Sequence, residues 1–128
     1  MPETDELLDA TTALIPPLLT ALDALRAAGR HMHPPMLAEL VDAIRPQHGG
    51  LVEGFDVFKN ATWPEHLETF VDCVNRSVGY ALRAFAQFEQ ALEAPQPAFI
   101  AYRAMGLTTK ATEALYPVAA MLPPVSRF

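Results

Sequence analysis

The side chains that could act as nucleophiles in this sequence are few, and none lies in a catalytic motif. The chain has two serines, Ser77 and Ser126, and one cysteine, Cys73. A serine hydrolase places its nucleophile in a Gly-x-Ser-x-Gly turn between a strand and a helix. Ser77 lies in a stretch with helical spacing, and Cys73 follows Asp72 rather than a basic group that would favour its thiolate. We therefore expect Ser77 to be a small packing residue and Cys73 to be an inert thiol.

The four histidines do not form a recognisable metal-binding motif. Neither His-Glu-x-x-His nor Glu-x-x-His occurs in the sequence. His31 and His33 are the pair that could bind a metal, but they precede Pro34-Pro35 in a predicted loop with no carboxylate at useful spacing. The alternative is that they cap helix ends or face solvent. We predict no metal and no cofactor, and we keep His31 and His33 as weak ligand or interface candidates.

The other weak candidates for contact with a ligand or a partner are Trp63, Phe85, Phe88 and Glu89. Glu89 falls within an apolar helical sector that contains Phe85 and Phe88. A buried carboxylate must be paired or protonated. One interpretation is an acid that faces a ligand or a partner, and the other is a frayed helix end at which Glu89 reaches water. The aromatic residues are more typical of a core than of a cofactor site.

Length, composition and charge are those of an ordinary globular domain. The chain has 128 residues, of which 51% are hydrophobic and 19% are charged, and its net charge is −6. This composition excludes a disordered chain, and the acidic balance with scattered basic residues does not suit nucleic-acid binding. A single cysteine excludes an internal disulfide and a multi-cysteine zinc site, and it fits a reducing compartment.

The acidic start and the length of the apolar stretches bear on localisation. A secretory signal begins with positive charge and an apolar run, whereas this chain begins Met-Pro-Glu-Thr-Asp-Glu. The longest stretches without charge cover residues 10–22 and 114–126, and each has 13 residues and contains proline. A membrane helix needs about 18 or more apolar residues. We therefore expect a cytoplasmic protein without a membrane span.

Helical periodicity dominates the sequence, and proline and glycine interrupt it. Pro16-Pro17, Pro46, Gly49-Gly50 and Gly106 are expected to end or kink helices, because proline lacks a backbone donor and glycine disfavours helix. The sequence therefore predicts an all-α fold, a compact bundle of six or seven helices. These helices are expected over residues 4–15, 17–28, 35–45, 51–60, 63–93, 97–105 and 109–121.

The strongest helical pattern covers residues 63–93. Thr62 and Glu65 fit a capping box at its start. Small residues lie beside its apolar face and would let another backbone approach closely; they are Cys73, Ser77, Ala84 and Ala91. The apolar face itself consists of Leu67, Phe70, Val71, Val74, Val78, Leu82, Phe85, Phe88 and Leu92. We expect this long helix to be the central element of the bundle.

The predicted domain covers residues 1–122, and residues 123–128 form a tail or linker that begins with Pro123-Pro124. The chain ends on an apolar residue, Phe128, soon after this proline pair. Either the polypeptide continues into a further, C-terminal domain, or Phe128 packs back on the helical domain.

Five short segments follow one another along the chain: Met32-His33-Pro34-Pro35, Trp63-Pro64-Glu65-His66-Leu67, Ala101-Tyr102-Arg103-Ala104, Ala114-Leu115-Tyr116-Pro117 and Leu122-Pro123-Pro124-Val125-Ser126-Arg127-Phe128. In this order they resemble the N-terminal helical region of some bacterial serine esterases of the phospholipase/carboxylesterase type. The resemblance implies that a catalytic α/β-hydrolase domain follows the helical region. The family's nucleophile, acid and histidine would lie beyond Phe128, so no catalytic residue carries over to this chain.

These observations lead to a non-catalytic helical accessory or interaction domain as the expected function. The resemblance implies that its partner is the chain's own C-terminal catalytic domain. The helical domain would dock on that catalytic domain, cover part of its substrate entrance, or hold two subunits of the protein together. Two alternatives stay open. One is a stand-alone helical protein that associates with a second copy of itself. The other is a bundle that binds a small molecule near Trp63, Phe85, Phe88 and Glu89.

Overall fold

Four α-helices make up most of the computed structural model, which describes residues 2–30, 37–93, 95 and 97–121. They are α1 (Pro2–Arg30), α2 (Leu37–Asn60), α3 (Glu68–Ala91) and α4 (Pro97–Leu115). Two 3₁₀ helices, η2 (Glu65–Leu67) and η3 (Tyr116–Met121), precede α3 and follow α4. No strand occurs within these described ranges, so the predicted all-α class is confirmed.

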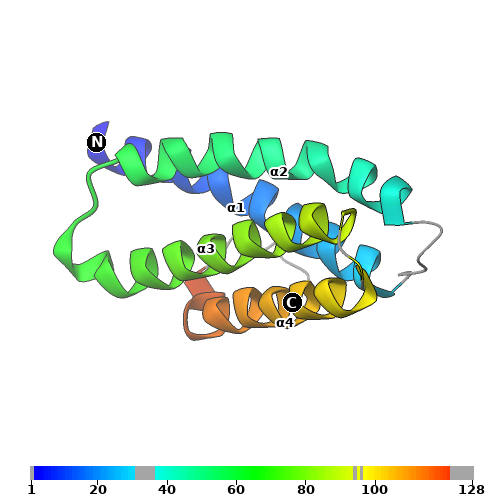
Figure 1. Ribbon diagram of the computed structural model, residues 1–128. Helices are drawn as coiled ribbons and strands as arrows, with labels where there is room; N and C mark the ends of the chain where they lie inside the picture. The colour runs from blue at the N-terminus through cyan, green and yellow to red at the C-terminus, as the bar shows by residue number, and fades with distance from the viewer. Residues whose placement is uncertain (1, 31–36, 94, 96, 122–128) are drawn as a thin grey trace.

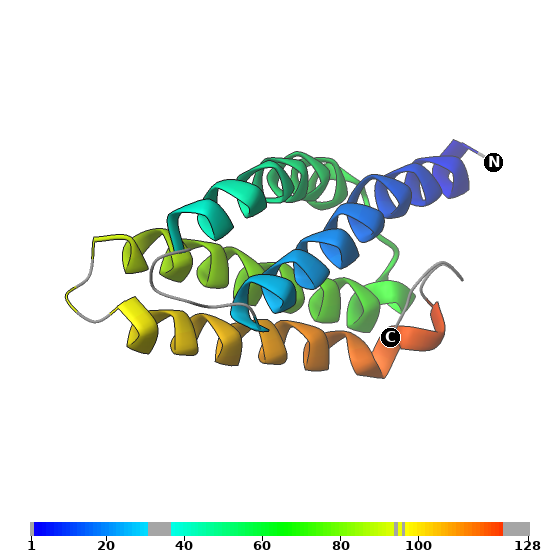
Figure 2. The same ribbon diagram turned by 90° about the vertical axis from the view of Figure 1, so that its right-hand side faces the viewer.

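The helices pack as two helical hairpins, α1 with α2 and α3 with α4. Figure 1 shows α3 and α4 side by side along their lengths, and Figure 2 shows α1 inclined across the rest of the bundle. α1 also contacts α4, where Arg26 Nη1 donates a hydrogen bond of 3.0 Å to Thr112 Oγ1. The contact between α2 and α3 is much less extensive than the contact within each hairpin. A partly open side of the bundle therefore lies between α2 and α3.

The core is aliphatic along α1 and partly aromatic along α3. The predicted apolar face of α3 is largely confirmed, because Phe70, Val74, Val78, Phe85 and Phe88 are all buried. α1 contributes a continuous row of buried side chains at helical spacing, namely Leu14, Ile15, Leu18, Ala21, Leu22, Leu25 and Ala28. Burial of each such leucine or phenylalanine contributes about 1.5–3 kcal/mol relative to an exposed side chain.

α4 faces α3 with small side chains, and this lets the two helices lie close together. The buried residues of α4 are Ala101, Ala104, Thr108, Ala111 and Leu115. On α3, the predicted flank of small residues (Cys73, Ser77, Ala84 and Ala91) is buried as well. Ser77 Oγ donates a hydrogen bond of 2.7 Å to the Ala111 carbonyl oxygen across this contact. The prediction that this flank admits a neighbouring backbone is therefore confirmed at Ser77.

The prediction of six or seven helices is wrong, because three of the predicted breaks are absent. α1 continues through Pro16-Pro17, α2 continues through Pro46 and Gly49-Gly50, and α4 continues through Gly106. The four helices have 29, 24, 24 and 19 residues, so α3 is one of several long helices, and it contacts each of the other three. A proline inside a helix costs about 3 kcal/mol, and the apolar rows that continue on both sides of each break outweigh this cost.

One of these prolines has a visible consequence at the contact between α1 and α2. Pro17 has no N–H, so the Ala13 carbonyl oxygen lacks its usual donor in the helix. A Cβ atom placed at Gly54 would overlap this carbonyl oxygen. Gly54 is buried in α2. Glycine at this position therefore lets α2 approach α1 closely at the point where proline interrupts the hydrogen bonding of α1.

The predicted capping box at the start of the long helix is also wrong. Leu67 is the N-cap of α3 and Pro64 is the N-cap of η2, and neither position has a side-chain capping hydrogen bond. The first turn of the predicted helix is a 3₁₀ turn closed by the backbone bond from Leu67 N–H to the Pro64 carbonyl, 3.0 Å long. The tight 3₁₀ turn satisfies backbone groups locally, so the chain enters α3 without the Thr62 and Glu65 side chains.

One segment among the described residues, Glu6–Gly29 of α1, is long and apolar enough to cross a membrane by length and composition. The core helix of a soluble protein and a signal sequence near the N-terminus both meet this criterion, and Leu14, Leu18, Leu22 and Leu25 of this segment are buried inside the bundle. The expectation of a chain without a membrane span therefore stays a prediction.

The predicted tail at residues 123–128, with both alternatives for Phe128, lies outside the described residues.

Candidate functional site

The open side of the bundle contains a cavity of about 540 Å³ between α2 and α3, which we call the α2–α3 groove. Its volume is within the range of small-molecule sites, roughly 300–1,000 Å³. A Cβ atom placed at Gly49 would have no neighbour within 4 Å, so the glycine borders free space. The groove is lined by Ile44, Arg45, His48 and Gly49 of α2 and by Phe85, Ala86 and Glu89 of α3.

An ion pair joins the two helices at the groove. Arg45 Nε and Nη2 donate hydrogen bonds of 2.7 and 3.0 Å to the two carboxylate oxygens of Glu89, and Arg45 Nη1 also pairs with Asp42. Glu89 is in the last turn of α3, which has no basic residue of its own, and a negative charge there opposes the helix dipole. Arg45 supplies from α2 the positive charge that this helix end lacks.

The hydrogen bonds of this ion pair change the acidity of both groups in the expected directions. The pKa of Glu89 is lowered, first because its carboxylate accepts hydrogen bonds from Arg45 and further because of the nearby positive charge. The pKa of Arg45 is raised, chiefly by the same hydrogen bonds with Glu89. Glu89 is therefore a carboxylate bound to arginine at the surface. The side chain is about half exposed, and it lies within a formed helix rather than at a frayed end.

An aromatic contact forms the wall of the groove beside the ion pair. The His48 and Phe85 rings lie edge to face, with centroids 5.1 Å apart and an angle of 64° between their planes. Phe85 is buried by this packing, whereas His48 is exposed. The arrangement combines a mainly apolar cavity with an arginine, a carboxylate and an imidazole in its lining. These groups can hold a small molecule that has an apolar body and a polar head.

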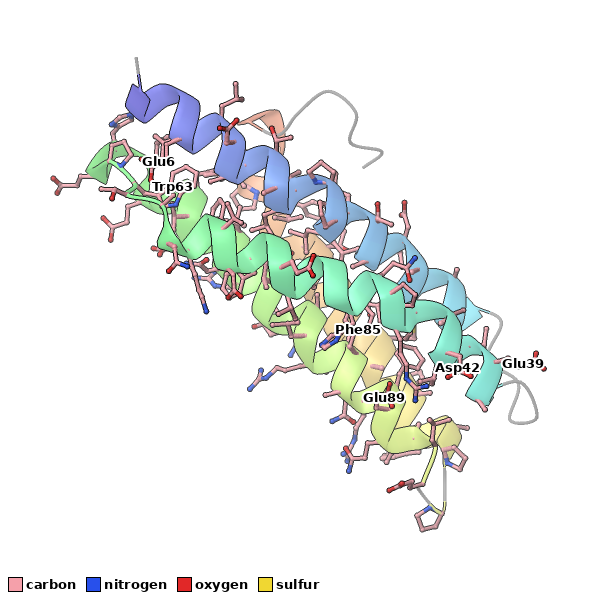
Figure 3. All side chains as sticks on the ribbon, turned by 90° about the horizontal axis from the view of Figure 1, so that it is seen from above. Glu6, Glu39, Asp42, Trp63, Phe85 and Glu89 are labelled. Carbon is pink, nitrogen blue, oxygen red and sulfur yellow. The ribbon has the colours of Figure 1, made fainter. Side chains whose placement is uncertain are left out.

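The four candidates on and near α3 separate into different places. Figure 3 shows Phe85 and Glu89 beside α2 and not far from Asp42, with Trp63 at the opposite end of the molecule. Trp63 packs against Phe58, with ring centroids 4.6 Å apart, and its Nε1–H donates a hydrogen bond of 2.9 Å to the Phe58 carbonyl. Phe88 is fully buried in the core. Phe85 and Glu89 therefore belong to the groove, whereas Trp63 and Phe88 have structural contacts.

His31 and His33 lie outside the described residues. Sequence reasoning missed Arg45 and His48 because their partners are 44 and 37 residues away along the chain. The local signal was the spacing of Asp42 and Arg45, which is typical of an ion pair on one helix. Only the packing of α2 against α3 brings Glu89 to that arginine.

The possible nucleophiles in the described part of the chain are not accessible. Ser77 is fully buried and its hydroxyl donates to the Ala111 carbonyl, and Cys73 is buried as a free thiol. Neither side chain lies in the α2–α3 groove. Within the described ranges, no group of three or more histidine, cysteine, aspartate and glutamate side chains could hold a metal ion.

A second surface of interest is the outer side of α4. Three aromatic side chains are more than half exposed there: Phe99 (57%), Tyr102 (75%) and Tyr116 (59%), the last at the start of η3. We define the α4 face as Phe99, Tyr102, Gly106, Thr109, Glu113 and Tyr116, which recur at steps of three and four residues. It lies opposite the buried residues of α4. Figures 1 and 2 both show α4 at the margin of the bundle.

Comparisons of this chain with family models, curated proteins and solved structures give no match.

Proposed function

We propose that this chain is a non-catalytic helical interaction module, and that it serves as the accessory domain of an esterase-like hydrolase. The α4 face is the observation that carries the interaction role. Exposed tyrosine and phenylalanine are enriched in the centres of protein interfaces, where they contribute a large contact area at a small entropic cost. Three such side chains on one face, two on α4 and one at the start of η3, are an unusual exposure for a side of a domain that remains in water.

Two further observations support a module without chemistry of its own. Ser77 and Cys73 are buried on α3, and neither lines the α2–α3 groove. The groups at the α2–α3 groove, Arg45 and Glu89, are already bonded to each other. The hydrolase part of the proposal is supported by the resemblance of the Pro-rich segments to the helical region of serine esterases.

The coding sequence that follows the codon for Phe128 tests the hydrolase part. A reading frame that continues into a strand-rich segment with Gly-x-Ser-x-Gly supports the proposal. A stop codon, or a continuation without that motif, overturns the hydrolase part.

The interaction role without catalysis is tested with the purified chain. We expect no hydrolysis of a short acyl ester such as p-nitrophenyl butyrate above the buffer rate. Turnover that disappears in Ser77→Ala or in Cys73→Ala would show that the chain is itself an enzyme. An equal residual rate in the wild type and both variants would be the signature of a contaminating esterase and would leave the proposal standing.

The α2–α3 groove favours a second candidate function, the binding of a small molecule. The charges of Arg45 and Glu89, which line the groove, balance each other, and Asp42, which pairs with Arg45 outside the lining, adds one negative charge near its edge. Such an edge favours an apolar ligand with a single positive charge over an anionic one. Hexylammonium, hexanol and hexanoate are suitable probes, because they share the apolar chain and differ in charge.

Two glycine positions provide a matched test of this candidate. Gly49 borders the groove and Gly79 lies on the outer side of α3, and at both a Cβ atom would meet nothing within 4 Å. We expect hexylammonium to shift the NMR signals of His48 and Phe85 in the wild-type protein. Gly49→Leu should abolish this shift, whereas Gly79→Leu should leave it unchanged. No shift with any of the three probes at millimolar concentration would argue against the groove as a binding site for this class of ligand.

A further inference from the structure

The α4 face has a pattern that is complementary to itself. Its two ends have aromatic side chains, Phe99 and Tyr116, and its centre has two small ones, Gly106 and Thr109. Tyr102 and Glu113 lie at equal distances along the helix from that centre. The pairs Phe99 with Tyr116, Tyr102 with Glu113 and Gly106 with Thr109 all have their midpoint between residues 107 and 108. A helix with this symmetry can pair with an identical helix that runs in the opposite direction.

We infer that the partner of the α4 face is a second copy of this chain, bound antiparallel about a two-fold axis. This inference rests on the proposed interaction role of the α4 face and names its partner. The axis places Phe99 opposite Tyr116 of the second copy and Tyr102 opposite Glu113 of the second copy. Gly106 then lies opposite Thr109. Each of these contacts occurs twice in the dimer, as a two-fold interface requires.

Two of the three charged residues of α4, Arg103 and Glu113, distinguish antiparallel from parallel pairing, whereas the third, Lys110, has its Nζ 5.9 Å from the Tyr80 ring centroid of α3. Arg103 lies beside Tyr102 in the first half of the helix, with its guanidinium carbon 5.0 Å from the Phe99 ring centroid, and Glu113 lies in the second half. Antiparallel pairing brings Arg103 and the Tyr102 hydroxyl to Glu113 of the second copy. Parallel pairing would instead bring Glu113 to Glu113 and Arg103 to Arg103. Antiparallel helix dipoles also attract each other, whereas parallel ones repel.

The centre of the α4 face allows the two backbones to approach. A Cβ atom at Gly106 would meet nothing within 4 Å in its own chain, so no contact among the described residues requires glycine there. A glycine in an exposed helix interior destabilises the helix relative to alanine. In the proposed dimer this glycine gains a role, because it removes the side chain that would separate the two helices.

The expected dimer is weak, because one helix pair is a small interface. The α4 face extends over about 26 Å at ~1.5 Å per residue. A single contact of this length is at the lower end of the range for specific interfaces, so we expect dissociation constants in the micromolar range. The dimer should therefore appear only when protein concentration is raised.

Sedimentation equilibrium of the whole chain from about 5 µM to 1 mM tests the inference. We expect the mass to rise from that of the 14.0 kDa monomer toward twice that value. Tyr102→Asp and Gly106→Leu should each weaken association at least about tenfold, because each removes one central contact of the interface. Gly79→Leu makes the same glycine-to-leucine change on α3 and should not weaken association. Gly106→Leu removes an exposed helix glycine and should leave the monomer at least as stable, which separates loss of the dimer from loss of the fold.

Cysteine cross-linking tests the antiparallel direction in a Cys73→Ala background. A mixture of Phe99→Cys chains and Tyr116→Cys chains should form a mixed disulfide on oxidation, whereas each variant alone should form few disulfides. Disulfides within each variant alone would overturn the antiparallel direction. A strict monomer up to 1 mM, or a dimer that neither Tyr102→Asp nor Gly106→Leu weakens, overturns the inference as a whole. Neither outcome bears on the hydrolase proposal, because the coding sequence after the codon for Phe128 tests that proposal separately.

Discussion

At the scale of single residues, the structure shows two features that the sequence did not predict. One is a close approach of two backbones, and the other is an exposed ion pair. Gly54 lies against the Ala13 carbonyl that Pro17 leaves without its helical donor, and Arg45 joins Asp42 and Glu89 across two helices. The first feature is a steric requirement in the core. The second is an electrostatic contact in water, where ion pairs contribute little to stability.

Gly54→Ala is expected to destabilise the protein by about 1–3 kcal/mol, because the added methyl group would force α1 and α2 apart. Gly50→Ala is the matched control. It lies one helical turn away in α2, and its Cβ would meet nothing within 4 Å. It should stabilise the protein by about 0.5–1 kcal/mol through helix propensity. Urea denaturation of both variants checks the prediction, and equal effects of the two substitutions would contradict it.

The ion pair predicts a pH dependence of stability with a defined sign. The pKa of Glu89 in the folded protein lies below the ordinary value of 4.5 because of the hydrogen bonds from Arg45. The stabilisation is therefore complete above the unfolded-state pKa and is lost as the pH falls through the folded-state pKa. We expect Glu89→Gln to be less stable than the wild type at pH 7 and to approach it in acid. Urea denaturation between pH 7 and 3 measures the difference. Glu93→Gln serves as the control for loss of an exposed carboxylate.

At the scale of the elements, small side chains set the distance between α3 and α4. Ser77 on α3 donates to the Ala111 carbonyl of α4, and its neighbours across the contact are alanines and a threonine. A long side chain at position 77 would have to displace one of the two helices. The spacing of the second hairpin therefore depends on this row of small residues.

Ser77→Ala should cost about 0.5–1.5 kcal/mol, the value of one buried hydrogen bond. Ser77→Leu should cost more, because the larger side chain adds about 1–3 kcal/mol of overpacking. Arg76→Leu places the same side chain at the adjacent exposed position and should change stability by less than about 0.5 kcal/mol. Thermal unfolding compares the three variants. A Ser77→Leu protein as stable as Arg76→Leu would show that the helices are not closely packed there.

At the scale of the whole molecule, the two hairpins share one core and are expected to unfold together. Phe88 is fully buried, and Trp63 lies toward the other end of the molecule from the α2–α3 groove. Phe88→Ala should cost about 3–5 kcal/mol. Trp63 fluorescence and helical circular dichroism should report the same midpoint in the wild type and in the variant. Separate midpoints would show that the hairpins are independent units and would contradict the single domain predicted for residues 1–122.

The all-α class and the buried face of α3 follow from local sequence, because helical spacing of apolar residues carries that information within a few turns. The burial of Ser77 and Cys73 was also readable from their neighbours. The helix count was not, because Pro16-Pro17, Pro46 and Gly106 disfavour helix locally, and the balance is set by packing against distant segments. The ion pair of Arg45 with Glu89, the α2–α3 groove and the outward direction of the α4 face were decided by tertiary structure alone. Each depends on which helices lie side by side, and contacts between residues far apart in the chain leave no periodic signal in the sequence.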